Sequence, residues 1–256
     1  MGNPIKDLTE NLTFEKVLRM AIGTPGVKIH RDKFLRKELI KYYPESVVKQ
    51  AIDFNPAKAG VSKKKINDIS MQVINYETTK ATGVSMAASL PSSGVAAVSV
   101  GAATADITSY FAFILRVVQQ LAYLYGFDEF DLNENDVDSE TLNYIMVFLG
   151  VMFGVQGATS TLAKIADALA KNVAKSLGKK ALMKGTIYPI VKQIATKIGI
   201  RMTKQVFADT VASAIPLAGS ILSGALTFAM FKPCCLKLRD TLKSYNLCNP
   251  DYYVID

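Results

Sequence analysis

The sequence contains no tryptophan, one histidine and three cysteines. A single histidine argues against metal sites and acid–base sites that need a pair of histidines. Cys234 and Cys235 are adjacent and Cys248 has no obvious partner, so no disulfide framework is expected, and reduced cysteines indicate a cytoplasmic protein. The N-terminal residues carry early acids and have no apolar core, which predicts neither a secretory signal nor a transit peptide.

Sequence patterns that mark common active sites are missing as well. There is no phosphate-binding GxxxxGK[ST] loop, no HExxH or paired CxxC metal pattern, and no GxSxG nucleophile turn. His30 is expected to be an ordinary loop or helix-cap residue. The acids between Asp128 and Glu140 lack the glycine and the spacing of a calcium-binding EF-hand loop. The sequence therefore predicts no catalytic residue, no cofactor and no metal ion.

Strand signals are absent too, and the fold class expected is an all-α, multi-helix bundle. No alternation of apolar and polar residues persists, and no Asn-Gly turn separates two β-branched runs. Half of the 256 residues are hydrophobic and 20% are charged, which is enough apolar material to fill a core. Helices are expected from residue 7 or 9 to 22, over 31–42, 45–54, 62–89 and 93–125, and from 138 or 139 onward.

Three long stretches carry no charge: 81–105, 141–163 and 210–231. Each has the roughly 20 residues that cross a bilayer. Their content of Gly, Ala, Ser and Thr suits close helix–helix contact, and interfacial tryptophan is missing, so permanent spanning is the least favoured alternative. The glycines expected at helix contacts are Gly150, Gly154 and Gly157, on one face of a single helix that continues into the Lys-rich region, with Gly219 and Gly224 in the last stretch.

Charge is distributed unevenly along the chain. Residues 160–204 contain ten bases and one acid, a net charge of +9, whereas the whole chain carries +8. Residues 128–140 contain seven acids and no base. These segments predict either two solvated faces or a surface for anionic lipid, where each lysine contributes about 1 kcal/mol. The candidate lipid-binding lysines are Lys164, Lys171, Lys175, Lys179, Lys180 and Lys184.

Two charged residues stand alone in an expected apolar helix. Asp106 and Arg116 are ten residues apart, about 15 Å of helical rise, so they cannot pair with each other. Because an unpaired charge in such surroundings is costly, each needs a partner from another helix, a helix end or a ligand. In the structural interpretation, Asp106 caps a helix or meets a lysine, and Arg116 binds helix-end carbonyls. In the functional interpretation, Asp106, Tyr110, Arg116 and Tyr123 form a polar core site.

Two blocks of the sequence resemble the EcsC family. The first, TADITSYFAFILRVVQQLAYLYGF at 104–127, matches the family pattern at Asp106, Arg116, Leu121, Ala122, Tyr123, Leu124, Tyr125 and Gly126. The second, IPLAGSILSGALTFAMFKP at 215–233, is similar to the family's C-terminal segment at Pro216, Gly219, Gly224, Thr227 and Pro233, and Thr203 and Lys204 also fit. The resemblance covers roughly residues 69–245.

The resemblance implies a bacterial helical protein whose family namesake is encoded beside an ABC transporter. It implies no activity, no catalytic residue and no ligand. With the helix pattern, it supports an N-terminal helical extension at 1–60, an EcsC-like helical domain at 61–247 and a C-terminal tail at 248–256.

Two interpretations of function stay open. In the first, the protein is amphitropic: it is cytoplasmic, peripheral at the inner face of the cell membrane, and docks on anionic lipid through the basic segment, with insertion of apolar helices as a further option. In the second, it is a soluble structural or partner-binding protein whose apolar helices stay buried. The basic segment lacks the interleaved aromatics of a nucleic-acid groove, so nucleic acid is not an expected partner. An enzyme with a pocket at Asp106 and Arg116 is the least supported alternative.

Overall fold

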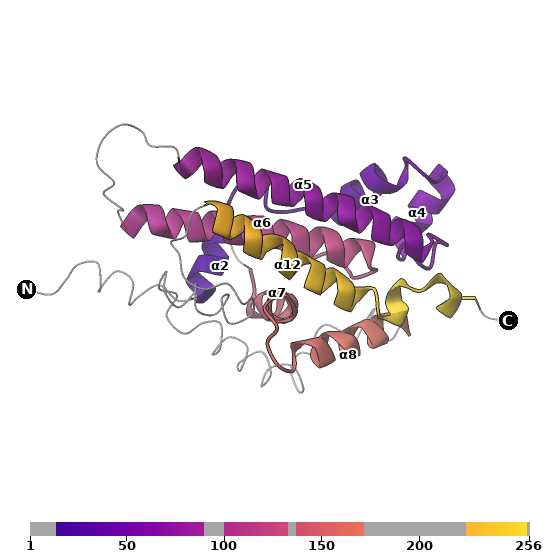
Figure 1. Ribbon diagram of the computed structural model, residues 1–256. Helices are drawn as coiled ribbons and strands as arrows, with labels where there is room; N and C mark the ends of the chain where they lie inside the picture. Colours follow the sequence, from indigo (N-terminus) through magenta and orange to yellow (C-terminus); the bar gives the residue numbers. More distant parts are fainter. Residues whose placement is uncertain (1–13, 90–99, 133–136, 172–223, 255–256) are drawn as a thin grey trace, which may run out of the picture.

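The computed structural model of the chain describes residues 14–89, 100–132, 137–171 and 224–254 (Figure 1). These residues form eight α-helices and two short 3-10 helices, with no strand among them, which confirms the expected all-α bundle. The α-helices are α2 (Phe14–Ile22), α3 (Arg31–Leu39), α4 (Glu45–Asp53), α5 (Lys63–Ser89), α6 (Val100–Leu124), α7 (Ser139–Met152), α8 (Ala158–Ala170) and α12 (Gly224–Leu242). The 3-10 helices η2 (Asn246–Cys248) and η3 (Pro250–Tyr252) follow α12.

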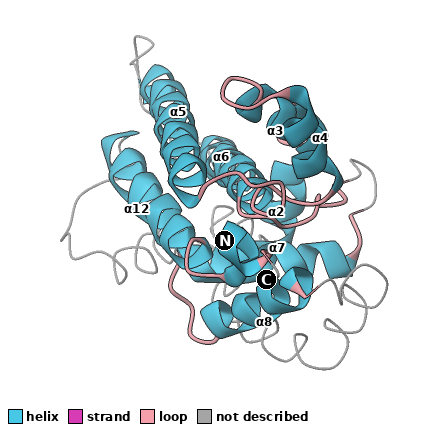
Figure 2. Cartoon of the chain, turned by 90° about the vertical axis from the view of Figure 1, so that its right-hand side faces the viewer, coloured by secondary structure: helices cyan, strands magenta, loops and turns pink. Residues whose placement is uncertain are grey.

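Three long helices, α5, α6 and α12, lie side by side at the centre of the bundle (Figure 1). Helices α5 and α6 run antiparallel, and α12 packs against both of them and against α7. Helices α2 and α3 pack on α6, α4 packs on α3, and α8 packs on α7 and η2. Figure 2 shows α3 and α4 on one side of the bundle and α8 on another.

One apolar core joins these helices. Its fully buried members include Leu18 of α2, Leu35 of α3, Ile69 of α5, Leu121 of α6 and Phe148 of α7. Burying such side chains away from water is the main favourable contribution to folding. The described part of residues 1–60 therefore contributes to the same core as the helices that follow it.

Side-chain caps begin helices α5 and α7. Ser62 Oγ accepts a hydrogen bond from Lys65 N at 3.2 Å. Asp138 Oδ1 accepts one from Thr141 N at 2.6 Å. Such a cap satisfies a backbone N–H that has no partner in the first turn of a helix. The predicted helix starts at Ser62 and at Asp138 or Ser139 are confirmed.

Helix α6 ends at the predicted glycine. Gly126 has φ 96°, a left-handed conformation that glycine adopts without steric cost. Its N–H donates to Tyr123 O at 3.3 Å, and Phe127 N donates to Ala122 O at 2.9 Å. This pair of hydrogen bonds is a Schellman motif, which satisfies carbonyls at a helix end. The turn also brings the backbone close to Leu247, since a methyl group on Gly126 would lie 3.0 Å from Leu247 Cγ.

Gly126→Ala is expected to lower the free energy of unfolding by about 2 kcal/mol or more, because the left-handed conformation costs an L-residue about 1–2 kcal/mol and Leu247 must also shift. Gly60→Ala is the matched control: Gly60 has φ 81°, and no atom lies within 4 Å of the added methyl group. Urea unfolding of both variants measures the difference. Equal losses would show that the contact with Leu247 contributes nothing.

Residues 141–163 do not form one continuous helix. Helix α7 ends at Met152, and Gly154 (φ 69°) and Gly157 (φ 86°) lie in the turn before α8. The prediction that Gly150, Gly154 and Gly157 line one face of a single helix is therefore wrong, and only Gly150 lies within α7. The spacing was misleading because glycine serves both close helix contacts and left-handed turns. Gly224 is the first residue of α12, and Gly219 lies outside the described residues.

The three uncharged stretches do not correspond to three single helices. Residues 81–89 end α5, residues 100–105 begin α6, and the stretch 141–163 is divided between α7 and α8. Residues 224–231 of the third stretch begin α12. Across the described ranges, no helix combines the length and the apolar character that crossing a membrane requires.

Candidate functional site

Polar residues of α6 anchor the loop that connects α2 to α3. Gln119 Nε2 donates to Val27 O at 2.8 Å, and Gln119 Oε1 accepts from Ile29 N at 2.9 Å. Arg116 Nη1 donates to Gly26 O. These hydrogen bonds hold the backbone of the loop in place, because breaking them would leave buried polar groups without partners, which costs free energy. The loop 26–30, which carries Lys28 and His30, is therefore held against α6.

Glu77 of α5 is a fully buried carboxylate that receives hydrogen bonds from α6. Arg116 Nη2 donates to Glu77 Oε1 at 2.8 Å, and Arg116 Nε lies 3.2 and 3.1 Å from the two carboxylate oxygens. Gln120 Nε2 donates to Glu77 Oε1 at 2.8 Å. The side chain of Glu77 is 0% exposed and that of Arg116 is 21% exposed. Of the partners expected for Arg116 (another helix, a helix end or a ligand), the structure shows a residue of another helix, Glu77, and not the helix-end carbonyls of the structural interpretation.

Helix α3 carries buried apolar residues on one face and exposed lysines on another. Phe34, Leu35 and Leu39 are buried in the core, whereas Lys33 and Lys37 are exposed. Residues four apart lie on the same side of a helix, so Lys33 and Lys37 form a basic stripe. Lys41, one further turn along, lies just beyond the helix.

Glu38 lies within the basic stripe of α3. Its side chain is 12% exposed and pairs with two lysines. Lys41 Nζ lies 2.5 Å from Glu38 Oε2, and Lys37 Nζ lies 3.8 Å from Glu38 Oε1. Glu38 therefore neutralises part of the positive charge of this stripe.

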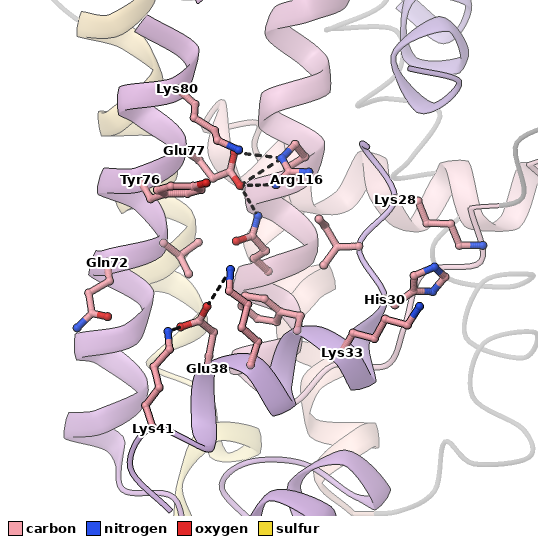
Figure 3. Close-up of a pocket in the computed structure, with 15 residues that line it drawn as sticks. Lys28, His30, Lys33, Glu38, Lys41, Gln72, Tyr76, Glu77, Lys80 and Arg116 are labelled. Carbon is pink, nitrogen blue, oxygen red and sulfur yellow. Dashed lines mark hydrogen bonds and ion pairs between the residues drawn. The ribbon is translucent and has the colours of Figure 1, made fainter. Parts of the chain in front are cut away.

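These elements enclose a pocket of about 610 Å³ between the loop 26–30, α3, α5 and α6 (Figure 3). This volume lies within the range of small-molecule sites. The basic residues that line it are Lys28, Lys33, Lys37, Lys41, Lys80 and Arg116, and the acidic ones are Glu38 and Glu77. With His30 neutral, the lining has a net charge of +4. Both carboxylates are already ion-paired within the protein, so the pocket is suited to binding anions.

The basic groups stand on separate sides of the pocket. Figure 3 shows Lys80 and Arg116 beside Glu77 on one side and Lys28 and Lys33 on another. Lys80 Nζ lies 4.7 Å from the centre of the Tyr76 ring. In the described ranges, Lys28, Lys33 and Lys80 take part in no ion pair. An anion that enters the pocket therefore meets three lysines that are not already in an ion pair.

The two tyrosines of the expected polar core site lie in aromatic packing. Tyr110 is 5% exposed, and its ring contacts that of Phe231 edge-on at 6.0 Å. Tyr123 OH accepts a hydrogen bond from Phe130 N at 3.3 Å. Burial raises the pKa of Tyr110 and the pKa of Tyr123 well above the ordinary value of a phenol. Neither tyrosine lines the pocket to which Arg116 belongs.

Asp106, the fourth residue of that site, lies within α6, and its side chain is outside the described residues. Of the four residues, Arg116 is the one that the structure places at a pocket. His30 occupies the N-cap position of α3 without a capping hydrogen bond, as expected for a loop or cap residue. It also lines the pocket, and its Nδ1 lies 3.5 Å from Glu129 Oε1.

Two of the lysines expected to bind lipid are described. Lys164 is exposed on α8, and Lys171, just after this helix, pairs with Asp167 at 2.7 Å. Lys175, Lys179, Lys180 and Lys184 lie outside the described residues. Helix α8, which carries Lys164, and helix α3, which lines the pocket, lie on different sides of the bundle (Figure 2).

The pocket was not predicted from the sequence. One signal was available, since Lys33, Lys37 and Lys41 recur every four residues beside the apolar positions of α3. A single basic stripe is nevertheless typical of any solvated helix. Lys28 belongs to the loop 26–30 and Lys80 to α5. Both come close to the lysines of α3 only in the folded chain, where α3 and α5 pack on α6, and no local sequence pattern predicts this.

No protein-family model, curated protein or solved structure matches this chain. The resemblance to the EcsC family therefore rests on the two sequence blocks. Within the first block, Arg116 lies at the pocket, and Tyr125 OH donates to Asn67 Oδ1 at 2.8 Å in the interface between α5 and α6.

Proposed function

We propose that this chain is an amphitropic protein of the EcsC family that docks on anionic membrane surfaces. The observation that carries the proposal is the pocket lining, with its net charge of +4 and both carboxylates already ion-paired. Each lysine near an anionic membrane contributes about 1 kcal/mol, so a few lysines on one face give measurable binding. The proposal locates the protein in the cytoplasm, peripheral at the inner face of the cell membrane of a bacterium.

Two exposed tyrosines near lysines support docking: Tyr76 lines the pocket, whereas Tyr42 contacts Lys65, which does not line it. Tyr42 is 43% exposed and Tyr76 is 55% exposed. Lys65 Nζ lies 3.7 Å from the ring centre of Tyr42, and Lys80 Nζ lies 4.7 Å from that of Tyr76. Aromatic rings and lysine stems suit the boundary between headgroups and acyl chains, where one end of the group is wet and the other apolar.

The charge of residues 160–204 gives independent support from the sequence. This segment has a net charge of +9, and a polybasic segment adds electrostatic attraction to anionic lipid. Since α8 and α3 lie on different sides of the bundle, this segment and the pocket are two separate candidates for the docking surface. Each surface is tested by its own variant.

Lys33→Glu with Lys80→Glu is expected to weaken binding to anionic liposomes by about tenfold or more, since two favourable contributions of about 1 kcal/mol become unfavourable. Lys237→Glu with Lys243→Glu makes the same change of charge at exposed positions of α12 and just after it, and neither residue lines the pocket. Co-sedimentation with liposomes, with and without anionic lipid and at low and high salt, measures the effect. Circular dichroism checks that both variants fold.

A third variant addresses the basic segment of the sequence: Lys171, Lys175, Lys179 and Lys180 are each replaced by Glu. Equal binding by the α12 control and the pocket variant would remove the pocket from the proposal. If native protein binds no liposome, docking on lipid is wrong, and the protein is better described as a soluble partner-binding bundle. In that case the pocket charge favours an acidic protein partner.

A further inference from the structure

We infer that the pocket is a specific site for a group that carries two phosphates. The group is either the headgroup of a lipid or a soluble diphosphate. This inference rests on the proposed function, since the same lysines serve both, but it adds selectivity that attraction to a charged surface does not provide. Three features of the pocket lead to it: its charge, the distribution of that charge, and the way its walls are held.

The charge of the pocket matches two phosphates better than one. Two phosphate monoesters carry about −3 to −4 at pH 7 and two phosphodiesters, as in a lipid headgroup, about −2, against a net charge of +4 on the lining. One phosphate would leave about half of this charge uncompensated. Like charges gathered around a partly enclosed space repel one another more strongly than in bulk water. The match therefore favours a ligand with two anionic groups.

The basic groups lie on separate sides of the pocket, as two anionic groups require. Lys80, next to Arg116, projects from one side, and Lys28 and Lys33 lie on another (Figure 3). The lining also includes Phe34 and Val73, which are buried and apolar. A ligand with two anionic groups offers a partner to lysines from both sides of the pocket.

The walls of the pocket are fixed before any ligand binds. Gln119 holds the loop 26–30 at both Val27 O and Ile29 N, and Arg116 holds Gly26 O. Arg116 is itself held by Glu77. Binding sites that are already in place need less ordering when the ligand arrives, which favours affinity and selectivity. A concave site of this kind accepts a protruding headgroup, whereas a flat patch of lysines responds only to the average charge of a surface.

Isothermal titration of the full chain with inorganic pyrophosphate and with orthophosphate tests the inference. Pyrophosphate is expected to bind at one site, about tenfold or more tightly than orthophosphate, because its second phosphate brings further negative charge to the basic lining. Lys33→Gln with Lys80→Gln should remove this difference, whereas Lys237→Gln with Lys243→Gln should preserve it. Equal affinity for the two anions, or an unchanged preference in the pocket variant, overturns the inference.

Liposomes of equal phosphate content separate the two sources of the ligand. One set contains cardiolipin, with two phosphates in its headgroup, and the other contains phosphatidylglycerol, with one. A preference for cardiolipin that pyrophosphate abolishes identifies a lipid headgroup as the ligand. Selectivity for pyrophosphate without a preference between liposomes identifies a soluble diphosphate. Both results support a site for two phosphates.

The same experiments distinguish failure of the inference from failure of the proposed function. Salt-sensitive binding to both sets of liposomes, without selectivity for pyrophosphate or cardiolipin, overturns the pocket site and leaves membrane docking standing. Selective binding of pyrophosphate by a protein that binds no liposome supports the pocket site and removes membrane docking.

Discussion

Glu77→Ala is expected to lower the free energy of unfolding by about 3–5 kcal/mol. The carboxylate of Glu77 is fully buried between α5 and α6 and accepts hydrogen bonds from Arg116 and Gln120. Without it, the guanidinium of Arg116 keeps most of its desolvation cost and loses its counter-ion. The amide of Gln120 also loses its acceptor in a buried position. Urea unfolding followed by circular dichroism measures the loss.

The control for Glu77 is removal of the whole pair. Glu77→Leu combined with Arg116→Met replaces both charges by apolar side chains of similar size, and such replacements are often neutral. The double variant is therefore expected to be more stable than Glu77→Ala. The four proteins of the cycle (native, Glu77→Leu, Arg116→Met and the double variant) give the coupling energy between the two side chains. Additive losses would mean that the two side chains do not act as a pair.

Local signals in the sequence were sufficient to predict the fold class and several helix ends. Ser62 and Asp138 were recognised as helix starts, and Gly126 as a helix end, because caps and glycine turns depend on a few consecutive residues. Gly154 and Gly157 misled the prediction since their spacing fits a helix face as well as a turn. Only the backbone conformation distinguishes these two roles.

The sequence alone does not identify the partner of Arg116. Arg116 stands out as a lone charge in an apolar helix, but Glu77 lies in the run NYETTK and looks like an exposed acid. Its neighbours Tyr76 and Lys80 are indeed exposed. Burial of Glu77 follows from the way α5 packs on α6, which joins residues 39 positions apart. The pocket was not predicted for a similar reason: its lysines come from segments that are separate in the sequence and meet only in the folded chain.

Arg31 is a second residue whose role only the structure reveals. Its side chain donates to Phe127 O at 3.1 Å, Ile52 O at 2.6 Å, Phe54 O at 2.9 Å and Ala51 O at 3.3 Å. It thereby binds the carbonyls at the end of α4, the role considered for Arg116 from the sequence. Carbonyls at a helix end have no partner within the helix and carry partial negative charge. Burial lowers the pKa of Arg31, and Asp128 opposes this shift.

Arg31→Met is expected to lower the free energy of unfolding by about 3 kcal/mol or more, because four carbonyl contacts disappear at a site that is 8% exposed. Arg31→Lys should lose most of the same stability, since one ammonium group cannot reproduce the fork of the guanidinium. Arg36→Met is the matched control on α3. Its ion pair with Glu45 joins side chains that are 52% and 58% exposed, so a loss within about 0.5 kcal/mol is expected. Urea unfolding measures the free energy of unfolding of the three variants. Equal losses of stability in Arg31→Met and Arg36→Met would show that burial of the Arg31 guanidinium does not contribute to stability.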